Sequence, residues 1–244
     1  MVNTFNWCHI DWMPRMNYGI IHTGQPWMWF DSDQIFIEDS EELKLYLQKK
    51  PKKIICNDGY EYNPQIACGT FKSIQSYSYG KFSAEIQLPK GRNLWPSFWL
   101  VGEGKWPKNG EIDICENWTN KCGSYFRVTI PQPPYLVPSW DTTTNVHWEE
   151  DDEHKSSGSR RLPIIFSLKN PTNHFIKYEV EWRYDIILFR INGRIIRTYD
   201  HDIAKNLQYK RQYVVFNLWT IGLDYTLESP MIIRNFHYEP IDML

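Results

Sequence analysis

The chain has 244 residues and a formal net charge of -2, with 12 Trp and 15 Tyr among its aromatic side chains. The small net charge gives no reason to expect nucleic acid or an anionic membrane as a partner, and no apolar run is long enough to cross a bilayer. The length suits one large all-β domain with a sizeable core, so residues 1–244 are expected to form a single domain.

The N-terminal region is expected to wrap around the domain before its main strands begin. Residues 1–27 are rich in Trp and show no clear periodicity, and the start of the chain lacks the basic residues and apolar block of a signal peptide. Strands are predicted at 34–38 and at 43–48, the second from its alternating leucines. The basic run at 49–53 is predicted to be a solvated hairpin end.

The stretch 110–118 places three carboxylates within six residues that are otherwise typical of a strand. Side chains alternate between the two faces of a strand, so Glu111 and Asp113 share one face. Strict alternation would bury Glu116 in the core, which is costly for an ionised carboxylate. One extra residue at Ile114-Cys115, a β-bulge, returns Glu116 to the side of the other acids. We therefore predict a bulged strand whose acids face a polar cleft.

Two glutamates on one face with an aspartate between them suit a retaining glycosidase. One carboxylate attacks the anomeric carbon, and the other protonates the leaving oxygen and later activates water. Crowding of the three acids is expected to keep one glutamate protonated near neutral pH while its neighbour stays ionised. The alternative, an ordinary solvated acidic strand, fits poorly with the flanking Ile and Trp residues.

The acidic run and the segment before it resemble glycoside hydrolase family 16. The two motifs are Glu-Ile-Asp-Ile-Cys-Glu at 111–116 and Leu-Trp-Pro-Ser-Phe-Trp-Leu at 94–100. The resemblance is to the branch of the family that carries the bulge. It implies a β-jelly-roll sandwich of two antiparallel sheets with an open substrate cleft on the concave face. It also implies that Glu111 is the nucleophile, Asp113 the residue that tunes and orients it, and Glu116 the acid/base.

The same resemblance bears on two further positions. His147 lies in a strand expected beside the acidic one and would donate a hydrogen bond to a catalytic carboxylate; read from the residue alone, it is a satisfied polar side chain. Glu85 departs from the family, in which this position is more often basic and helps to shape the sugar subsites. This departure predicts subsites unlike the standard glucan ones.

Parity along the strands selects other residues for substrate binding. Trp95 and Trp99 share a face and would flank the bond to be cut by stacking on sugar rings, although either ring could instead belong to the core. The full set of substrate-binding candidates is Trp95, Trp99, His147, Trp118, Asn217 and Trp219.

Several other segments carry weaker signals. The Pro-rich excursion at 119–145 is expected to be a binding loop or lid, and the charged run at 149–161 a mobile, solvated loop. Asn192-Gly193 predicts a tight hairpin. The glycosylation sequon at 117–119 is attributed to chance, and Cys115 is expected to be a small buried thiol. The five cysteines have no paired short spacing and give no zinc pattern.

These observations predict an endo-acting, retaining glycoside hydrolase that cleaves internal β-glycosidic bonds of a polysaccharide, with a β-1,3 or mixed-linkage glucan as the leading substrate. A galactan such as agar, porphyran or carrageenan is an open alternative, as is a non-catalytic glycan-binding sandwich, and transglycosylation would use the same residues. No metal and no cofactor are expected to be required; a structural calcium ion has no ligand spacing to identify it. The expected partner is the polysaccharide, with no nucleic acid or membrane, and the protein is expected to be a monomer. The family implies a secreted, periplasmic or cell-surface location.

Overall fold

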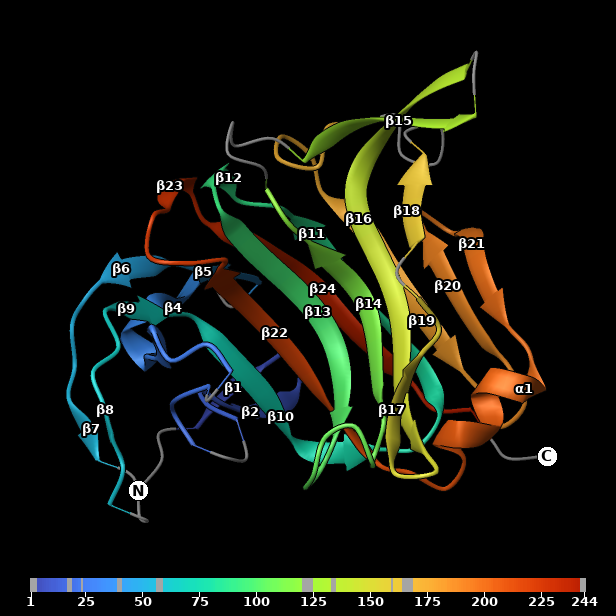
Figure 1. The fold of residues 1–244 in the computed structure, drawn as a ribbon, viewed down its shortest axis with the longest axis horizontal. Coiled ribbons are helices and arrows are strands. Elements are labelled where there is room, and N and C mark those ends of the chain that lie inside the picture. The colour runs from blue at the N-terminus through green and yellow to red at the C-terminus, as the bar shows by residue number, and fades with distance from the viewer. Residues whose placement is uncertain are drawn as a thin grey trace.

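The computed structural model describes residues 4–16, 19–22, 24–38, 41–55, 59–119, 125–132, 135–158, 160–163 and 169–241. Strands dominate it, and most of them belong to two antiparallel sheets that lie one behind the other (Figure 1). This arrangement confirms the predicted β-jelly-roll sandwich. The described residues include no helix with the length and apolar character needed to span a membrane.

The ten-stranded sheet carries the site described below. Its strands follow the order β1-β2-β10-β22-β13-β14-β16-β15, and β17 and β18 also pair with β16. The bounds are β1 (Phe5–Trp7), β2 (Ile10–Met13), β10 (Thr70–Tyr77), β22 (Gln212–Thr220), β13 (Leu94–Gly102), β14 (Glu111–Asn117), β16 (Tyr135–Glu150), β15 (Phe126–Gln132), β17 (Glu153–Ser156) and β18 (Arg160–Pro163).

The seven-stranded sheet forms the back of the sandwich, in the order β21-β20-β19-β11-β24-β5-β4. Its strands are β21 (Arg194–Tyr199), β20 (Ile187–Ile191), β19 (Ile176–Trp182), β11 (Gly80–Gln87), β24 (Met231–Glu239), β5 (Glu42–Leu45) and β4 (Ile35–Glu38). Smaller sheets join β3 (Met28–Phe30), β9 (Ile66–Cys68) and β6 (Leu47–Lys49), β12 (Lys90–Arg92) with β23 (Thr226–Ser229), and β7 (Ile54–Ile55) with β8 (Glu61–Tyr62). The short helices are α1 (His201–Ala204), η1 (Ser32–Gln34) and η3 (Lys205–Leu207).

The core lies between the two sheets and follows the period-2 pattern of their strands. Phe98 and Phe216, from neighbouring strands β13 and β22, are fully buried and stack with ring centroids 4.4 Å apart. Phe82 and Val180, from the back sheet, belong to the same core cluster and are also fully buried. Because alternate residues of β13, β14 and β22 are committed to this core, the residues between them face the opposite, concave side.

The N-terminal wrap takes part in the fold as two strands. β1 and β2 pair with each other, and β2 extends the ten-stranded sheet next to β10. Trp7 and Trp12 are buried, and their rings pack against Phe71 at centroid distances of 6.1 and 5.0 Å. Burial of two indoles of this size stabilises the fold by several kcal/mol, on the order of 2–3 kcal/mol each. The first strands are therefore part of the core.

One prediction for the region 34–53 was wrong. The predicted strand at 43–48 breaks at Tyr46, because the chain passes from β5 in the back sheet to β6 in a small sheet. The basic run at 49–53 is largely exposed, as predicted, and two of its lysines also make contacts. Lys50 Nζ lies 2.7 Å from Asp31 Oδ2, and Lys52 Nζ lies 3.9 Å from the centroid of the Trp29 ring.

Two predicted loops are hairpins. Within the Pro-rich excursion, β15 and β16 pair from Phe126↔Trp140 to Gln132↔Tyr135, and this ribbon projects beyond the sandwich at the top of Figure 1. Residues 133 and 134, at its tip, lie outside the described residues. In the charged run, Asp151 and Asp152 have positive φ, as a tight two-residue turn between strands requires, and connect β16 to β17. The predicted Asn192-Gly193 hairpin is confirmed between β20 and β21.

Candidate active site

The predicted bulge is present in β14. Opposite β13, Asp113 pairs with Trp99 and Cys115 with Phe98, so Ile114 is the extra residue. Ile114 and Cys115 are both buried, whereas Glu116 returns to the side of the other two acids. The bulge therefore sets the direction of Glu116 and keeps its carboxyl group out of the core.

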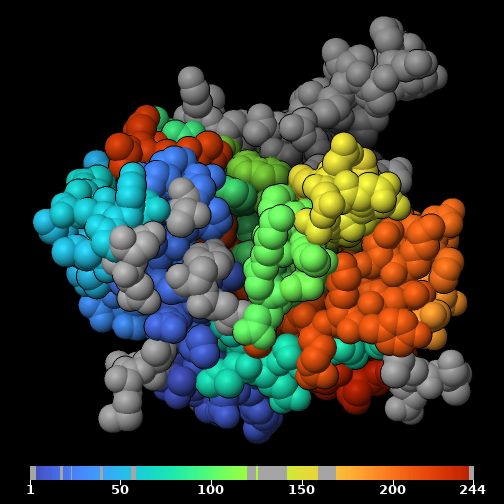
Figure 2. Space-filling model, turned by 60° about the horizontal axis from the view of Figure 1, so that its bottom comes forward, coloured from blue at the N-terminus to red at the C-terminus, as the bar shows by residue number. Residues whose placement is uncertain are grey.

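All three acids line one cavity of about 800 Å³ on the concave sheet. In the space-filling view of Figure 2, the bright-green turn before β14 stands between the blue N-terminal part of the chain and the yellow β16–β17 hairpin. Every site residue predicted from the sequence lies on this cavity: Glu111, Asp113 and Glu116, with Trp95, Trp99, Trp118, His147, Asn217 and Trp219.

Each glutamate accepts a hydrogen bond from a tryptophan indole. Trp95 Nε1 donates to Glu116 Oε1 at 3.0 Å, and Trp106 Nε1 donates to Glu111 Oε2 at 2.8 Å. Indole has a donor and no acceptor, so each contact favours the ionised form of the carboxyl group and fixes one of its oxygens. From the sequence, Trp106 could line the rim of the cleft or cap the turn at 102–110, and it was not among the substrate-binding candidates; the structure places it on the cavity lining. Its only signal was the turn-forming Pro-Lys-Asn-Gly segment that follows it, which bends the chain back so that Trp106 reaches Glu111.

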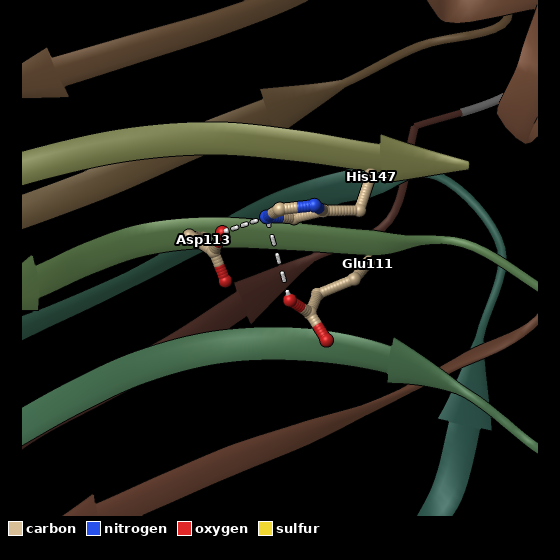
Figure 3. A group of neighbouring side chains, drawn as sticks. All are labelled: Glu111, Asp113 and His147. Carbon is tan, nitrogen blue, oxygen red and sulfur yellow. Dashed lines mark ion pairs between the residues drawn. The ribbon is translucent and has the colours of Figure 1, made fainter. Parts of the chain in front are cut away.

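His147 reaches the acids from the neighbouring strand β16. Its Nε2 lies 3.2 Å from Asp113 Oδ2 and 3.7 Å from Glu111 Oε1 (Figure 3). The register explains this placement, because Glu111 pairs directly with His147 and Asp113 with Asn145. Asn145 Nδ2 also lies 2.9 Å from His147 Nε2. The imidazole thus lies within reach of two of the three acids.

The acids share an environment that favours protonated carboxyl groups. Burial raises the pKa of Glu116 to about 8, with a further rise from the charge of Asp113 and partial compensation by the Trp95 hydrogen bond and by His147. Burial likewise raises the pKa of Asp113 to about 7, against a hydrogen bond with Glu111. The pKa of Glu111 is raised by burial and by the charge of Asp113. Glu111 and Asp113 therefore share a proton near neutral pH.

The floor of the cavity is fixed by hydrogen bonds among the predicted substrate-binding residues. Trp99 Nε1 donates to Asn217 Oδ1 at 2.7 Å, and Asn217 Nδ2 donates to the Trp95 carbonyl at 3.3 Å. Trp219 is only 4% exposed, and Phe30 stacks on it at 6.0 Å with an interplanar angle of 10°. Trp118 is half-buried beside Trp95, at a centroid distance of 5.9 Å, and is the more accessible platform for a sugar ring.

Sequence reasoning missed one wall of the cavity. Met16, Ile21 and His22, from the segment after β2, all line it, and the His22 ring meets Trp219 edge-on at 5.1 Å. This irregular segment has no periodicity that predicts its position. The backbone of Ile21 bridges to Trp29 of β3, and the His22–Trp219 contact brings the segment next to β22.

The expectation based on Glu85 was wrong. Glu85 lies on β11 of the back sheet, far from the cavity lining, and its Oε2 accepts a hydrogen bond from Arg234 Nε at 2.8 Å. Its neighbours Ala84 and Ile86 point into the core, so Glu85 faces the outer surface. The residue therefore gives no reason to expect unusual subsites.

Two smaller predictions concern the residues that flank Glu116. Cys115 is buried as expected, and burial raises the pKa of its thiol to about 12. Asn117 is fully buried and donates to Cys115 Sγ at 2.9 Å, so it is inaccessible for glycosylation in the folded protein. This burial supports the prediction that the sequon is a chance match.

Within the described ranges, one group of side chains could hold a metal ion: Glu111, Asp113 and His147. Their potential ligand atoms all lie within 4.8 Å of one another. The imidazole fits that role poorly. Its Nε2 lone pair is already directed at the Asn145 amide, 2.9 Å away. The absence of a required cofactor stays a prediction.

A concave β-sheet that brings two glutamates and an aspartate onto one open cavity defines a glycosidase type of site. The chain belongs to glycosyl hydrolases family 16, whose model matches residues 23–229.

Curated relatives share part of the chain. A glucan endo-1,3-beta-glucosidase of Cryptopygus antarcticus is 26% identical over 148 residues, which cover 58% of this chain and 47% of the relative. The clotting factor G alpha subunit of Tachypleus tridentatus is 28% identical over 140 residues, which cover 56% of this chain and 17% of that subunit. The matches thus span about half, or less, of the length of these relatives.

Solved structures share the fold over nearly the whole chain. The catalytic domain of an endo-1,3-beta-glucanase (laminarinase) from Thermotoga petrophila gives a TM-score of 0.68 at 17% identity, covering 98% of this chain and 95% of that domain. LamAcat from Zobellia galactanivorans gives 0.64 at 19% identity, covering 93% of this chain and 88% of that one.

Proposed function

We propose that the protein is an endo-acting, retaining glycoside hydrolase that cleaves internal β-glycosidic bonds of a polysaccharide. One observation carries the proposal: Glu111 and Glu116 line the same cavity, and each is held by its own indole N–H. An enzyme of this class needs two carboxyl groups with different proton occupancy on either side of one bond.

In the proposed mechanism Glu111 attacks the anomeric carbon as a carboxylate while Glu116 gives its proton to the leaving oxygen. The glycosidic bond breaks, and a covalent glycosyl-Glu111 ester forms. Glu116, now ionised, takes a proton from water, whose oxygen attacks the same carbon and releases Glu111. The raised pKa of Glu116, about 8, keeps this group protonated at neutral pH for the first step.

The leading substrate is a β-1,3 or mixed-linkage glucan. The glucanase names of the relatives support this choice, and the accessible rings of Trp95 and Trp118 suit the apolar faces of glucose units. A polymer of this kind also supports the expectation that the protein acts outside the cytoplasm, as a secreted, periplasmic or cell-surface enzyme.

A sulfated galactan is the second candidate, and Lys72 favours it. Its side chain lines the cavity, its Nζ lies 3.6 Å from the centroid of the Tyr213 ring, and burial lowers its pKa to about 8. A buried ammonium group beside the substrate would be stabilised by an anionic ester. A keratan-sulfate endo-1,4-beta-galactosidase of Sphingobacterium multivorum is 30% identical over 98 residues.

The test compares wild type, Glu111→Gln and the matched control Glu228→Gln, whose carboxylate is exposed on β23. Each is assayed on laminarin, mixed-linkage glucan, agarose, porphyran and carrageenan, with products followed by reducing ends and chromatography. We expect wild type and Glu228→Gln to shorten one polymer internally, and Glu111→Gln to be slower by at least about 10³-fold. Binding without cleavage by wild type would instead favour a glycan-binding sandwich. Longer products in the presence of acceptor sugars would indicate transglycosylation.

A further inference from the structure

We propose that Lys72 forms a subsite for a negatively charged group of the polysaccharide, a sulfate ester or a uronate carboxylate, away from the bond that is cut. The inference rests on the proposed function and deepens its second candidate. Lys72 lines the same cavity as the three acids, although it lies on a different strand, β10. A neutral glucan would leave the ammonium group of Lys72 without a counter-ion.

The sheet register places Lys72 on the path of a polymer that passes between the two glutamates. Both glutamates lie on β14, so a chain whose glycosidic bond lies between them crosses the strands rather than following them. Beside β14 come β13, β22 and β10, in that order (Figure 1). Lys72 pairs with Val215 of β22, which pairs with Trp99 of β13. Trp99 in turn pairs with Asp113. Lys72 is therefore in the same row of the sheet as Asp113, three strand spacings or about 14 Å away.

Lys72 is buried without a carboxylate partner. Only 2% of its surface is exposed, and lysine is rarely buried to this degree unless it is paired. Its Nζ donates a hydrogen bond to the Ser73 carbonyl at 3.1 Å and lies 3.6 Å from the centroid of the Tyr213 ring. Both contacts are with uncharged groups, and no carboxylate among the described residues forms an ion pair with Lys72. An ammonium group has three donors, so these two contacts leave one for a ligand in the cavity.

The charges near Lys72 make this end of the cavity positive. Burial lowers the pKa of Lys72 to about 8; the charge of Glu103 raises it, and the charge of Arg15 lowers it further. Lys72 is therefore still mostly charged at neutral pH. Arg15 Nε is buried and has no hydrogen-bond partner in the described part of the chain. Glu103 is exposed, and its Oε2 accepts a hydrogen bond from the Tyr213 hydroxyl at 3.1 Å. Two cations are thus opposed by one carboxylate that solvent screens.

A sulfate ester or a carboxylate supplies the partner that the protein does not provide here. Its oxygen atoms accept hydrogen bonds and carry a full negative charge, and hydrogen bonds between ionised groups are shorter and stronger than those between neutral groups. The ammonium group has already left water when the chain folds, so its desolvation is not part of the cost of binding. A sugar hydroxyl can accept the same hydrogen bond but leaves the buried charge uncompensated. The subsite should therefore prefer a charged polymer to a neutral one with the same backbone.

The test measures this preference within one backbone. Laminarin and agarose oligosaccharides are each prepared in neutral, sulfated and carboxymethylated form. Their Kd values are measured by isothermal titration calorimetry in a Glu111→Gln background, which prevents cleavage. In that background Lys72→Met and Lys72→Gln remove the ammonium group, one with an apolar and one with a polar side chain, and Lys72→Arg restores a cation. Lys90→Met removes an exposed cation on β12, outside the cavity lining, and is the matched control.

We expect one charged form to bind at least about tenfold more tightly than its neutral parent, because a hydrogen bond between charged groups is gained. The ratio of the two Kd values should fall below about twofold in Lys72→Met and Lys72→Gln, and stay high in Lys72→Arg and Lys90→Met. The form with the larger ratio, sulfated or carboxymethylated, identifies the anion. Lys72→Met should melt at the same temperature as its parent or higher, because an apolar side chain replaces a buried ammonium group.

An unchanged ratio in Lys72→Met and Lys72→Gln, or no preference for charge in the Glu111→Gln parent, would overturn the proposal. Cleavage of neutral laminarin by wild type without such a preference would support the proposed hydrolase while the anion subsite fails. A charge preference that depends on Lys72, in a protein whose wild type cleaves no polymer, would support the subsite and contradict the hydrolase. Binding of none of these ligands, charged or neutral, would contradict both.

Discussion

Trp95 and Glu116 form a hydrogen bond of 3.0 Å that links strand β13 to the bulged strand β14. The contact lowers the pKa of Glu116 against the larger effect of burial. Trp95→Phe keeps the ring and removes the donor, so the pKa of Glu116 should rise. Because Glu116 acts first as an acid, the alkaline limb of kcat/KM should move to higher pH by several tenths of a unit. Trp118→Phe, a neighbouring ring that has no role in holding Glu116, should leave that limb in place.

The bulge predicts how deletions within β14 affect cleavage. Deletion of Ile114 alone gives a regular strand in which Glu116 still faces the cavity, because one residue is removed between two cavity-facing positions. Deletion of both Ile114 and Cys115 turns Glu116 toward the core. We expect the single deletion to keep measurable cleavage and the double deletion to lose it by at least about 10³-fold, with a lower Tm. Equal activities in the two variants would contradict the assigned role of the bulge.

The raised pKa of Glu116 also predicts how stability depends on pH. Its value in the folded protein, about 8, lies above the ordinary value of 4.5. The folded state therefore binds more protons than the unfolded state between these pH values, and the stability of wild type falls as pH rises through that window. Glu116→Gln cannot ionise and escapes this loss. Its Tm should exceed that of wild type by several degrees at pH 9, and the difference should shrink at pH 4.

Trp12 and Trp106 separate stability from activity. Trp12 is fully buried and its Nε1 donates to the Trp7 carbonyl at 2.9 Å, so Trp12→Ala should cost about 3–5 kcal/mol of unfolding free energy. Trp106 is 48% exposed, and Trp106→Ala should change stability by less than about 1 kcal/mol. Its loss should lower kcat, because Glu111 loses a hydrogen bond. Chemical denaturation and initial rates measure the two effects on the same samples.

The expectation that no metal is required has a direct test. Exhaustive treatment with EDTA, followed by gel filtration, should leave the rate of polymer cleavage within about 20% of the untreated value. A loss of activity that Ca²⁺ or Mg²⁺ restores would show that an ion is needed. Thermal melting before and after treatment distinguishes a structural ion from one that takes part in the reaction.

The strand that carries the acids could be predicted in detail because its pattern leaves few solutions. Three acids and two isoleucines allow one arrangement without a buried charge, and it requires an extra residue near Ile114. The hairpin at Asn192-Gly193 could be predicted equally well, because only a few residue types tolerate positive φ. Both the bulged strand and the hairpin are determined by residues that are close together in the sequence.

Long-range contacts could not be predicted in the same way. The sequence around Trp106 does not indicate that its indole contacts Glu111, because the contact depends on how the turn folds back. Met16 and Ile21 reach the cavity through an irregular segment without a repeating pattern. Glu85 was misplaced because sequence alternation separates the faces of a strand but does not say to which sheet the strand belongs.

The match to the family begins at residue 23, yet Trp7 and Trp12 are part of the hydrophobic core, and Met16, Ile21 and His22 line the cavity. The stretch that the family model matches is therefore shorter than the unit that folds. A chimera that exchanged catalytic domains between relatives at the family boundary would leave Phe71 and its neighbours without their packing partners and would also change the shape of the cleft. Exchange of specificity between such enzymes would require the first two strands to be transferred together with the cleft that they help to build.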